Sequence, residues 1–594
     1  MEFPIVNEVT RYREMTNAFG GYNHQLSCEE GQFFDMKNMT SQYYPILSPR
    51  QSRGIVRKLN NPQGILDKEE LMWIDNGKLF VNGEEVALDG VTLSSEGAKT
   101  MAKMGAYVII MPDKVWYNAD DGKCGYMESK YETEGEVTFT LCEADGSAIT
   151  WHDDAYYKSH EPKNGDYMMT KVNGKASLKV YSASTSIWAT VATTYMQIGA
   201  TGIGKAFEKE DGVKITIDNS EAKWDYASNI FVNDEENGKR STNTQIVDKT
   251  DDCITIVALL DDNHTFTNME LTVERGVPDM AFITECNNRL WGCSTDGHEI
   301  YCCKLGDVKN WNCFAGISTD SWAVTIGSDG KFTGAITYLG YPMFFKEDCF
   351  IKISVSGTGG HQTKETRCRG VQKGSERSLA ILNETLFYKS TTGVCSYGGS
   401  LPVGISESLG EVRYYDAVAG TIGNRYYISM KDKEGKSHLF VYDLKKGIWS
   451  KEDNTDVMYF CKHGDDLYYI DMTDNFMKSV GGTLLYDVEE KDTEGKFGWF
   501  VESGNIGYSS PDNKYVSRIN VRISLDFGTN VDFYLQYDSS GRWEHKFNMS
   551  GKGTRTFTVP VIPKRCDHFK YKLVGKGGCK VHSITKTTEQ GSDI

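Results

Sequence analysis

The sequence predicts an all-β protein whose centre is a β-propeller of about seven blades. A short phrase recurs along the chain, in which a polar or glycine-containing turn precedes two or three apolar residues, most of them aromatic. Measured on these aromatics, the steps from Trp291 to Phe344, Phe387, Tyr427 and Tyr468 are 53, 43, 40 and 41 residues. A repeat of roughly 40 residues built from hairpins is typical of propeller blades.

The composition agrees with this prediction. Of the 594 residues, 59 are glycine and only 12 are proline, and aromatic residues make up 12 %. Such a chain suits many short strands joined by tight turns. A hydrophobic fraction of 39 % is high enough for an ordered core.

Residues 1–55 are predicted to form an extended N-terminal arm. Gly20-Gly21, Gly31, Pro45 and Pro49 occur at a density that prevents a long helix. An arm of this kind becomes ordered only when it docks on another surface. Threading onto a neighbouring subunit would supply such a surface.

The propeller is predicted in two parts, residues 56–131 and 278–495, with an insertion at 132–277. Two blade-like hairpins precede the insertion, and about five blades of roughly 40 residues follow it. The insertion alternates apolar and polar residues, which predicts one inserted β domain or a pair of small ones. Closing the ring of blades removes exposed sheet edges.

Residues 496–594 are predicted to form a C-terminal β-sandwich, after a charged linker near residues 489–496. Two successive strands alternate strictly between apolar and polar residues, which places the apolar ones on a shared face. These residues are Ile519, Val521, Ile523, Leu525 and Phe527 in one strand, and Val531, Phe533, Leu535 and Tyr537 in the next.

The charge is unevenly distributed along the chain. The net charge is -17, yet residues 514–594 hold 14 Lys and Arg against 7 Asp and Glu. This segment therefore carries +7 and the remainder -24. An acidic body argues against a general nucleic-acid clamp, and the basic module could complement a like chain or another partner. An ordinary solvated face would explain the same asymmetry.

The cysteines and the terminus predict assembly in a cytoplasm. The 15 cysteines are an odd number without a C-x-x-C pair, which favours buried free thiols over disulfides or zinc. Residues 1–15 lack the apolar segment of a secretory signal. The longest apolar stretches are far too short to span a membrane, so no membrane association is predicted.

One motif is reminiscent of a phosphate-binding loop. Gly199 to Lys205 has the required glycines and lysine, but Ala206 replaces the hydroxyl residue that would hold Mg²⁺. The turn at Asp211-Gly212 also leaves no room for the helix that would face a phosphate. We interpret the segment as a glycine-rich hairpin loop and predict no cofactor.

Catalytic and metal-binding patterns are missing from the sequence. The candidates Ser294 to Gly297 and Ser328 to Gly330 break the spacing of a sialidase Asp-box, and the clusters around His152 and His463 are explained by hairpin turns. Asp251-Asp252 and Asp261-Asp262 do not form an EF-hand loop. The sequence therefore predicts no catalytic, cofactor-binding or metal-ligating residue and no enzyme, although a site assembled by folding would escape such a search.

Aromatic residues in the insertion leave a binding role open. Tyr181, Trp188 and Tyr195 would form a platform for stacking sugars if they lie on one exposed face. Alternating aromatics in a β domain are more often core residues.

The N-terminal arm carries a resemblance to a known group of proteins. Its pattern resembles the opening of tailed-bacteriophage neck and tail proteins, the propeller-bearing stopper or nozzle proteins below the portal. The residues that carry it are Gly20-Gly21, Leu26, Glu30-Gly31, Asn38-Met39 and Leu47 to Arg50. The propeller segments at 278–311 and 370–374 look like those of prophages from anaerobic Gram-positive bacteria.

This resemblance implies a non-enzymatic structural protein of the virion. Identical copies would form a ring, a hexamer by analogy with the family, around the channel through which DNA is ejected. The partners implied are the portal or adaptor, other tail proteins, and DNA that passes without sequence-specific contacts. Two rival hypotheses are a host-surface glycan-binding tail protein, whose insertion carries the ligand platform, and a propeller hydrolase acting on surface polysaccharide.

Overall fold

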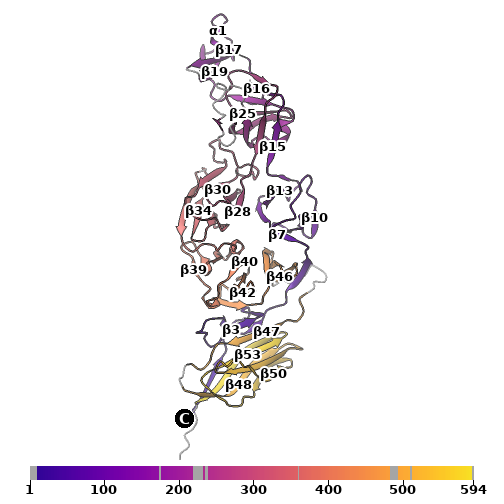
Figure 1. Cartoon of the computed structure of the whole chain (residues 1–594), viewed down its shortest axis with the longest axis vertical. Coiled ribbons are helices and arrows are strands. Elements are labelled where there is room, and N and C mark those ends of the chain that lie inside the picture. The colour runs from indigo at the N-terminus through magenta and orange to yellow at the C-terminus, as the bar shows by residue number, and fades with distance from the viewer. Residues whose placement is uncertain are drawn as a thin grey trace, which may run out of the picture.

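The computed structural model describes residues 10–172, 175–217, 232–233, 239–358, 360–481, 493–508 and 512–590. These residues form three β-rich bodies in an elongated row, with the propeller between the insertion and the sandwich (Figure 1). The predicted all-β class and the propeller are both confirmed.

Seven four-stranded antiparallel sheets make up the propeller blades in the described part of the chain. The two blades before the insertion are β7 (Pro62–Asp67), β8 (Leu71–Asp75), β9 (Lys78–Val81) and β10 (Glu84–Val86), then β11 (Thr100–Met104), β12 (Tyr107–Met111), β13 (Val115–Asn118) and β14 (Cys124–Tyr126). The third and fourth blades are β28 (Met280–Glu285), β29 (Leu290–Ser294), β30 (Glu299–Cys302) and β31 (Trp322–Thr325), then β32 (Gly334–Tyr338), β33 (Tyr341–Phe345), β34 (Cys349–Ser354) and β35 (Gln362–Arg367). The fifth and sixth blades are β36 (Ala380–Leu382), β37 (Thr385–Ser390), β38 (Gly393–Tyr397) and β39 (Val403–Gly404), then β40 (Tyr415–Ile422), β41 (Arg425–Lys431), β42 (Ser437–Asp443) and β43 (Ile448–Lys451). Short 3₁₀ turns flank the fifth blade at η2 (Glu376–Ser378) and η3 (Glu407–Leu409).

A strand from the N-terminal part of the chain closes the ring. The seventh blade contains β44 (Val457–His463), β45 (Asp466–Asp471) and β46 (Phe476–Gly481), and its outer strand is β6 (Gly54–Lys58). β6 pairs antiparallel with β46. The first strand β44 contacts β7 of the first blade, so the last blade packs against the first and the ring is closed.

The repeated aromatics form the core between the blades. Trp291, Phe344, Phe387, Tyr427 and Tyr468 each lie in the second strand of a blade, and all are buried. The one long step of the repeat, 53 residues, arises from the connection between β30 and β31, which spans residues 303–321. The repeated aromatics are therefore the residues that pack between neighbouring blades.

The insertion consists of a nine-stranded sheet with a smaller sheet at its tip (Figure 1). The strands of the large sheet are β15 (Ser129–Thr133), β16 (Val137–Cys142), β21 (Tyr195–Gly199), β22 (Gly212–Ile217), β23 (Val232–Asn233), β24 (Arg240–Thr250), β25 (Cys253–Val257), β26 (His264–Phe266) and β27 (Leu271–Arg275). The tip sheet contains β17 (Trp151–Asp153), β18 (Tyr167–Val172), β19 (Lys175–Ser182) and β20 (Ile187–Thr190), together with the one-turn helix α1 (Asp154–Tyr157). The 3₁₀ turn η1 (Ile203–Ala206) follows β21.

Polar contacts fix the base of the insertion to the third blade. Asp211 forms a buried ion pair with Arg275 and accepts a hydrogen bond of 3.1 Å from the amide of Asn310. The amide oxygen of Asn310 accepts in turn from Gly212 N at 2.8 Å. Asn310 belongs to the β30–β31 connection at residues 303–321. This long connection therefore binds the base of the insertion.

Two sheets of five and six strands form the sandwich. The first contains β1 (Arg11–Thr16), β54 (Cys579–Gln590), β48 (Lys514–Leu525), β51 (Gly553–Val559) and β52 (Arg565–Cys566). The second contains β2 (Gly21–Tyr22), β3 (Gln32–Lys37), β47 (Gly498–Ser503), β53 (Phe569–Lys576), β49 (Asn530–Tyr537) and β50 (Glu544–Ser550). A separate small ladder joins β4 (Met39–Thr40) to β5 (Ser48–Pro49).

The arm docks on the sandwich of its own chain. From the sequence alone its partner is open, and a neighbouring subunit is one prediction. Residues 1–9 lie outside the described residues. From Arg11 onward β1 pairs along its length with β54, and β3 pairs with β47. Phe19, Tyr22, Phe33 and Met36 are buried in a core cluster that the sandwich shares with the fifth and sixth blades. The C-terminal strands therefore supply the surface that the arm needs.

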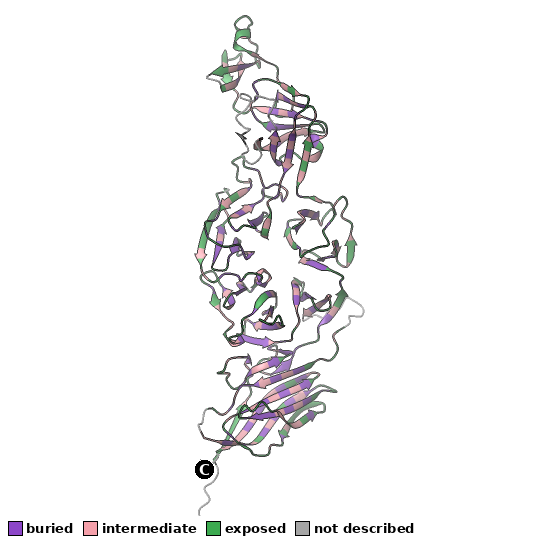
Figure 2. Cartoon of the chain, in the orientation of Figure 1, coloured by how far each residue is buried: buried purple, intermediate pink, exposed green. Residues whose placement is uncertain are grey.

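Burial alternates along the sandwich strands, as the sequence predicts (Figure 2). Ile519, Val521 and Ile523 are buried, whereas Arg522 is exposed. Phe527 is the exception. The alternation predicts it on the same apolar face as Leu525, but β48 ends at Leu525. The Phe527 side chain is 84 % exposed in the following turn. Of the predicted charged linker, residues 489–492 lie outside the described ones.

Candidate functional site

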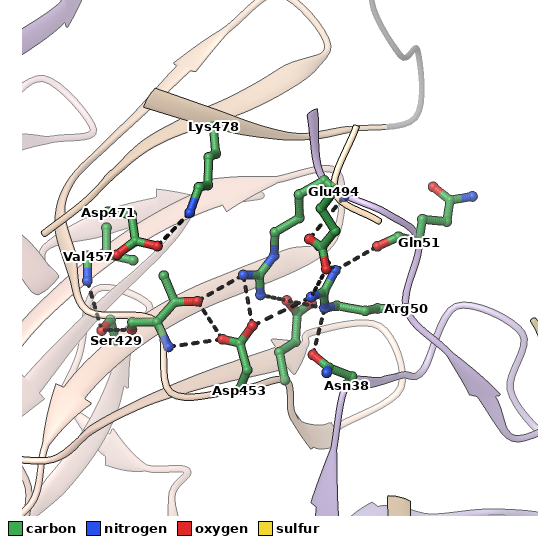
Figure 3. Close-up of polar contacts among 12 residues, drawn as sticks. Asn38, Arg50, Gln51, Ser429, Asp453, Val457, Asp471, Lys478 and Glu494 are labelled. Carbon is green, nitrogen blue, oxygen red and sulfur yellow. Dashed lines mark hydrogen bonds and ion pairs between the residues drawn. The ribbon is translucent and has the colours of Figure 1, made fainter. Parts of the chain in front are cut away.

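A cluster of buried ions joins the arm, the propeller and the start of the sandwich (Figure 3). Arg50 and Arg53 come from the arm, Glu452 and Asp453 from the connection between β43 and β44, and Glu494 from the segment that leads to β47. Both arginine side chains and that of Glu452 are almost fully buried. Segments some 400 residues apart in sequence thus meet at one charged junction.

The Arg50 side chain contacts two segments, whereas the Arg53 side chain contacts two adjacent carboxylates of one segment. Arg50 forms a two-pronged ion pair with Glu494, with N–O distances of 2.7 and 3.1 Å, and also donates from Nε to Asn38 Oδ1 at 2.9 Å. Arg53 contacts Glu452 at 2.5 Å and Asp453 at 2.9 Å. Bidentate geometry of this kind holds the partners in a fixed orientation.

The pKa of Asp453 reflects these contacts. Burial by itself would raise it, but the Arg53 guanidinium, the Thr455 hydroxyl and Arg50 outweigh burial and lower the pKa to about 2. Burial would likewise lower the pKa of Arg53, yet Tyr469, Asp453 and Glu452 raise it well above its usual value. Both groups are charged at neutral pH, and the junction is a structural lock between its three segments.

The residues that carry the family resemblance lie at and around this lock. Gly21 has φ +80°, and a Cβ there would collide with the backbone oxygen of Trp449 in the sixth blade. Asn38, with φ 56°, binds Arg50 and also donates to Gly498 O at 2.8 Å. Met39 and Leu47 are buried. These positions are therefore explained by packing within the chain.

Leu26 is the exception among the motif residues, because its side chain is 99 % exposed. The loop that carries it is anchored directly before Leu26: His24 N donates to Ser408 O at 2.8 Å, and Gln25 Nε2 donates to Glu407 O at 3.1 Å. Leu26 lies at the edge of a cavity of about 1250 Å³ between this loop and the fifth blade. Val412 adds a second exposed apolar side chain there.

The outer face of the first sandwich sheet is basic. Arg13 on β1 and Arg518 on β48 both pair with Thr587, so the two guanidinium groups flank a single threonine, and Arg522 lies on the same face of β48. All three side chains are exposed. Within the described ranges, none of the three forms an ion pair. The same face also carries Asn520, the ion pair of Arg11 with Glu589, and hydroxyl residues at Thr554, Thr556, Thr558, Ser583 and Thr585.

Two of the three predicted platform aromatics come together at the tip of the insertion. Tyr181 on β19 lies directly opposite Trp188 on β20, with ring centroids 5.2 Å apart. Tyr157 from α1 adds a third ring 4.9 Å from Trp188. Tyr195 does not belong to this group, because it lies in β21 of the large sheet, where it pairs with Cys142 and Val257.

Tyr157 and the stacked rings of His152, Tyr156 and His160 beside it are not predicted from the sequence. His152 stacks on Tyr156 with centroids 3.7 Å apart, and Tyr156 stacks on His160 at 4.0 Å. Asp153 caps α1 by accepting from Tyr156 N at 2.8 Å. The sequence pattern around His152 and Asp153 predicts only a turn. The feature that could have indicated the helix is Asp153, an N-cap residue shortly before Tyr156 and Tyr157.

The remaining motifs form ordinary turns. The segment from Gly199 to Lys205 continues β21 into η1, and Gly202 N donates to Asp252. Ser294 Oγ accepts from His298 N at 3.2 Å within the turn between β29 and β30. His463 binds Asp67 of the first blade at 2.7 Å rather than the aspartates next to it in sequence.

In the described part of the chain, no group of three or more His, Cys, Asp and Glu side chains is arranged to hold a metal ion. None of the helices there is long and apolar enough to cross a membrane.

Comparisons with known proteins identify no family for the chain, because no family model and no curated protein matches it. Among solved structures, BamB from Moraxella catarrhalis is 10 % identical with a TM-score of 0.31, covering 74 % of this chain and all of its own. The computationally designed Ika8 protein is 9 % identical with a TM-score of 0.31, covering 72 % of this chain and 99 % of its own. An exo-beta-1,3-galactanase from Phanerochaete chrysosporium is 9 % identical with a TM-score of 0.20, covering 50 % and 92 %.

These matches are β-propellers, and several are glycoside hydrolases. At such identities and TM-scores they carry no argument about the activity of this chain. The prediction that the chain is not an enzyme therefore stays a prediction.

Proposed function

We propose that the chain is a structural protein of a tailed-phage particle, located at the neck or the tail nozzle. Identical copies form a ring, a hexamer in the simplest case, that continues the DNA channel below the portal. Its neighbours are the portal or adaptor and other tail proteins. The proposal rests on the resemblance of the arm and on the following features of the structure.

The observation that carries the proposal is the exposure of Leu26 on a well-anchored loop. The other motif residues named above are engaged within the chain, where they hold the arm to the body. A fully exposed leucine on a fixed backbone gains no stability within the monomer, whereas it would bury its surface against a second copy. Val412 at the same cavity edge enlarges the apolar area available for such a contact.

The charge distribution supports association between identical copies. The outer sandwich face presents Arg13, Arg518 and Arg522, while the chain outside residues 514–594 carries a charge of -24. Contact between the basic face of one copy and the acidic body of the next would be favourable and would fix their orientation. An acidic surface would also let DNA pass without adhering, because like charges repel phosphate.

The buried lock suits a load-bearing part of a particle. Arg50 and Arg53 hold arm, propeller and sandwich in one arrangement through ion pairs that solvent cannot easily screen. Removing one carboxylate would leave the two buried arginines with fewer counter-charges. The arm thus fixes the propeller and the sandwich relative to each other at this end of the molecule.

Electron microscopy and mass photometry of the purified full chain test the proposal. We expect rings of one defined copy number at micromolar concentration, and association at least about tenfold weaker in Leu26→Ser, because an apolar contact is lost. Ile562→Ser is the matched control, since Ile562 is 82 % exposed on a sandwich loop away from the arm. A chain that stays monomeric and is absent from purified particles by mass spectrometry would refute the proposal.

A further inference from the structure

The outer face of the tip sheet carries an aromatic surface that the core of the protein does not use. Strand alternation and register assign its residues: Met169 and Leu178 point into the core of the insertion, so Tyr181 and Trp188 lie on the opposite face. Tyr157 reaches the same face from α1, and its ring contacts Trp188. None of these three rings belongs to a buried core cluster in the described chain.

The three rings form a stepped platform that is open to solvent. Tyr157, Trp188 and Tyr181 are each only partly buried, with successive centroids 4.9 and 5.2 Å apart and ring planes inclined by 59° and 54°. In the cartoon the tip lies at the far end of the molecule from the sandwich (Figure 1).

The backbone under the platform is fixed. The cross-strand pair of Tyr181 and Trp188 is held by the β19–β20 ladder, and Tyr181 N donates to Asp166 O at 2.9 Å. The Asp153 cap positions α1 and therefore Tyr157. A preformed platform loses little conformational entropy when a ligand binds.

Polar groups surround the rings without a dominant sign of charge. Asp166 and Asn164 lie in the turn that leads to β18, and their side chains accept from Lys163 N at 2.8 Å and from Ala183 N at 3.0 Å. Lys179 lies on the same face as Tyr181, one pair further along β19. Carboxylate, amide and ammonium groups together can donate to and accept from hydroxyl groups.

We propose that this face binds a neutral polysaccharide, with the C–H face of a hexopyranose ring stacked on Trp188. An aromatic platform with a few fixed polar groups at its rim matches the two faces of a sugar, which is apolar on its C–H surface and polar at its hydroxyls. The balanced charges around the rings favour an uncharged ligand over a phosphate polymer. The inference does not rest on the phage role and applies to the chain in any assembly.

Affinity electrophoresis of the full chain tests this inference. The probes are soluble neutral glucan, galactan, mannan and xylan, with polyglycerol phosphate as a polyanion. We expect at least one neutral polysaccharide to retard the protein, and Trp188→Ala and Tyr181→Ala each to weaken the retardation about tenfold or more. The aromatic replacement Trp188→Phe keeps a stacking surface, so it should retain most of the binding even if Trp188→Ala folds poorly.

Tyr508→Ala provides the control, because Tyr508 is an exposed tyrosine, at 60 %, that lies in the sandwich and outside the platform. It should leave the retardation unchanged. Retardation by none of the neutral polysaccharides overturns the inference, as does retardation that is equal in wild type and Trp188→Ala. Retardation by polyglycerol phosphate alone also overturns it and would indicate a charge-driven surface. Rings seen by microscopy without any retardation would leave the proposed assembly intact and reject the sugar site.

Discussion

Replacing Asp453 by Asn should lower the free energy of unfolding by about 2 to 4 kcal/mol at pH 7. The fall of the Asp453 pKa from 3.8 to about 2 corresponds to about 2 kcal/mol. Removing one partner of a buried ion pair costs about 3 to 5 kcal/mol. Here Glu452 and Glu494 still neutralise the two arginines, so the upper bound is reduced.

The effect of Asp453 has a defined pH window. Its pKa in the folded chain lies below the unfolded value of 3.8, so its contribution to stability is complete well above pH 3.8. As the pH falls from 3.8 through about 2 the carboxylate takes up a proton in the folded chain as well, and the contribution is lost. The difference between wild type and Asp453→Asn should therefore be constant near neutral pH and should shrink below pH 3.8.

Urea unfolding at a series of pH values measures this difference. Circular dichroism and tryptophan fluorescence should be followed together, because coincident transitions are needed before a free energy is derived for a chain of this size. Asp121→Asn is the control: hydrogen bonds from Lys123 lower the pKa of Asp121 too, but that pair is fully exposed, so no loss of stability is expected. An unchanged urea midpoint for Asp453→Asn, or a difference that persists undiminished at pH 2, would refute the account of the lock.

Three further predictions concern other parts of the chain. Gly21→Ala should be more destabilising than Gly90→Ala by about 1 to 3 kcal/mol in the same urea assay, because both glycines have positive φ but only the first is crowded by other backbone. Arg518→Glu combined with Arg522→Glu should weaken self-association, and the wild-type association should weaken with added salt, as read by sedimentation velocity; salt-independent association would contradict this. Burial raises the pKa of the Cys303 thiol, so iodoacetamide should modify Cys303 only after unfolding, as peptide mass spectrometry would detect.

The blades could be predicted from sequence because their signal is local and periodic. Each copy of the repeat places aromatics such as Phe344 and Phe387 in the second strand, and burial of that strand requires apolar residues in a short run. Only the long connection at 303–321 disturbs the period. Its length reflects contacts with the insertion that a repeat count does not detect.

The partners of the arm could not be predicted in the same way. β6 pairs with β46, and β1 with β54, across more than 400 residues of sequence. The arm has the composition of an extended segment wherever it docks, so pattern alone cannot distinguish its own sandwich from a neighbouring subunit. The ion pairs of Arg50 and Arg53 could not be predicted either, because no sequence pattern links these arginines to acidic residues so far along the chain.

The tip aromatics show a different limit. Alternation tells which residues share a face, but it does not tell which face meets the core. Tyr181 and Trp188 fit a buried stripe as well as an exposed one until β18 and β19 are placed over the core of the insertion through Met169 and Leu178. Tyr195 follows the same alternation and yet belongs to another sheet.

The arm completes both the last blade and the sandwich sheets of its own chain. The phage resemblance of its sequence is therefore weaker support for assembly with other molecules. Its β6 completes the last blade, and its β1 to β3 complete both sandwich sheets. Gly21, Asn38 and Arg50 are needed for these intramolecular tasks, so their presence alone does not require a partner molecule. Leu26 is different, because nothing within the described chain covers it. The case for assembly therefore depends on Leu26 and the cavity beside it, and the Leu26→Ser comparison separates assembly from folding because the side chain contributes nothing to the monomer's core.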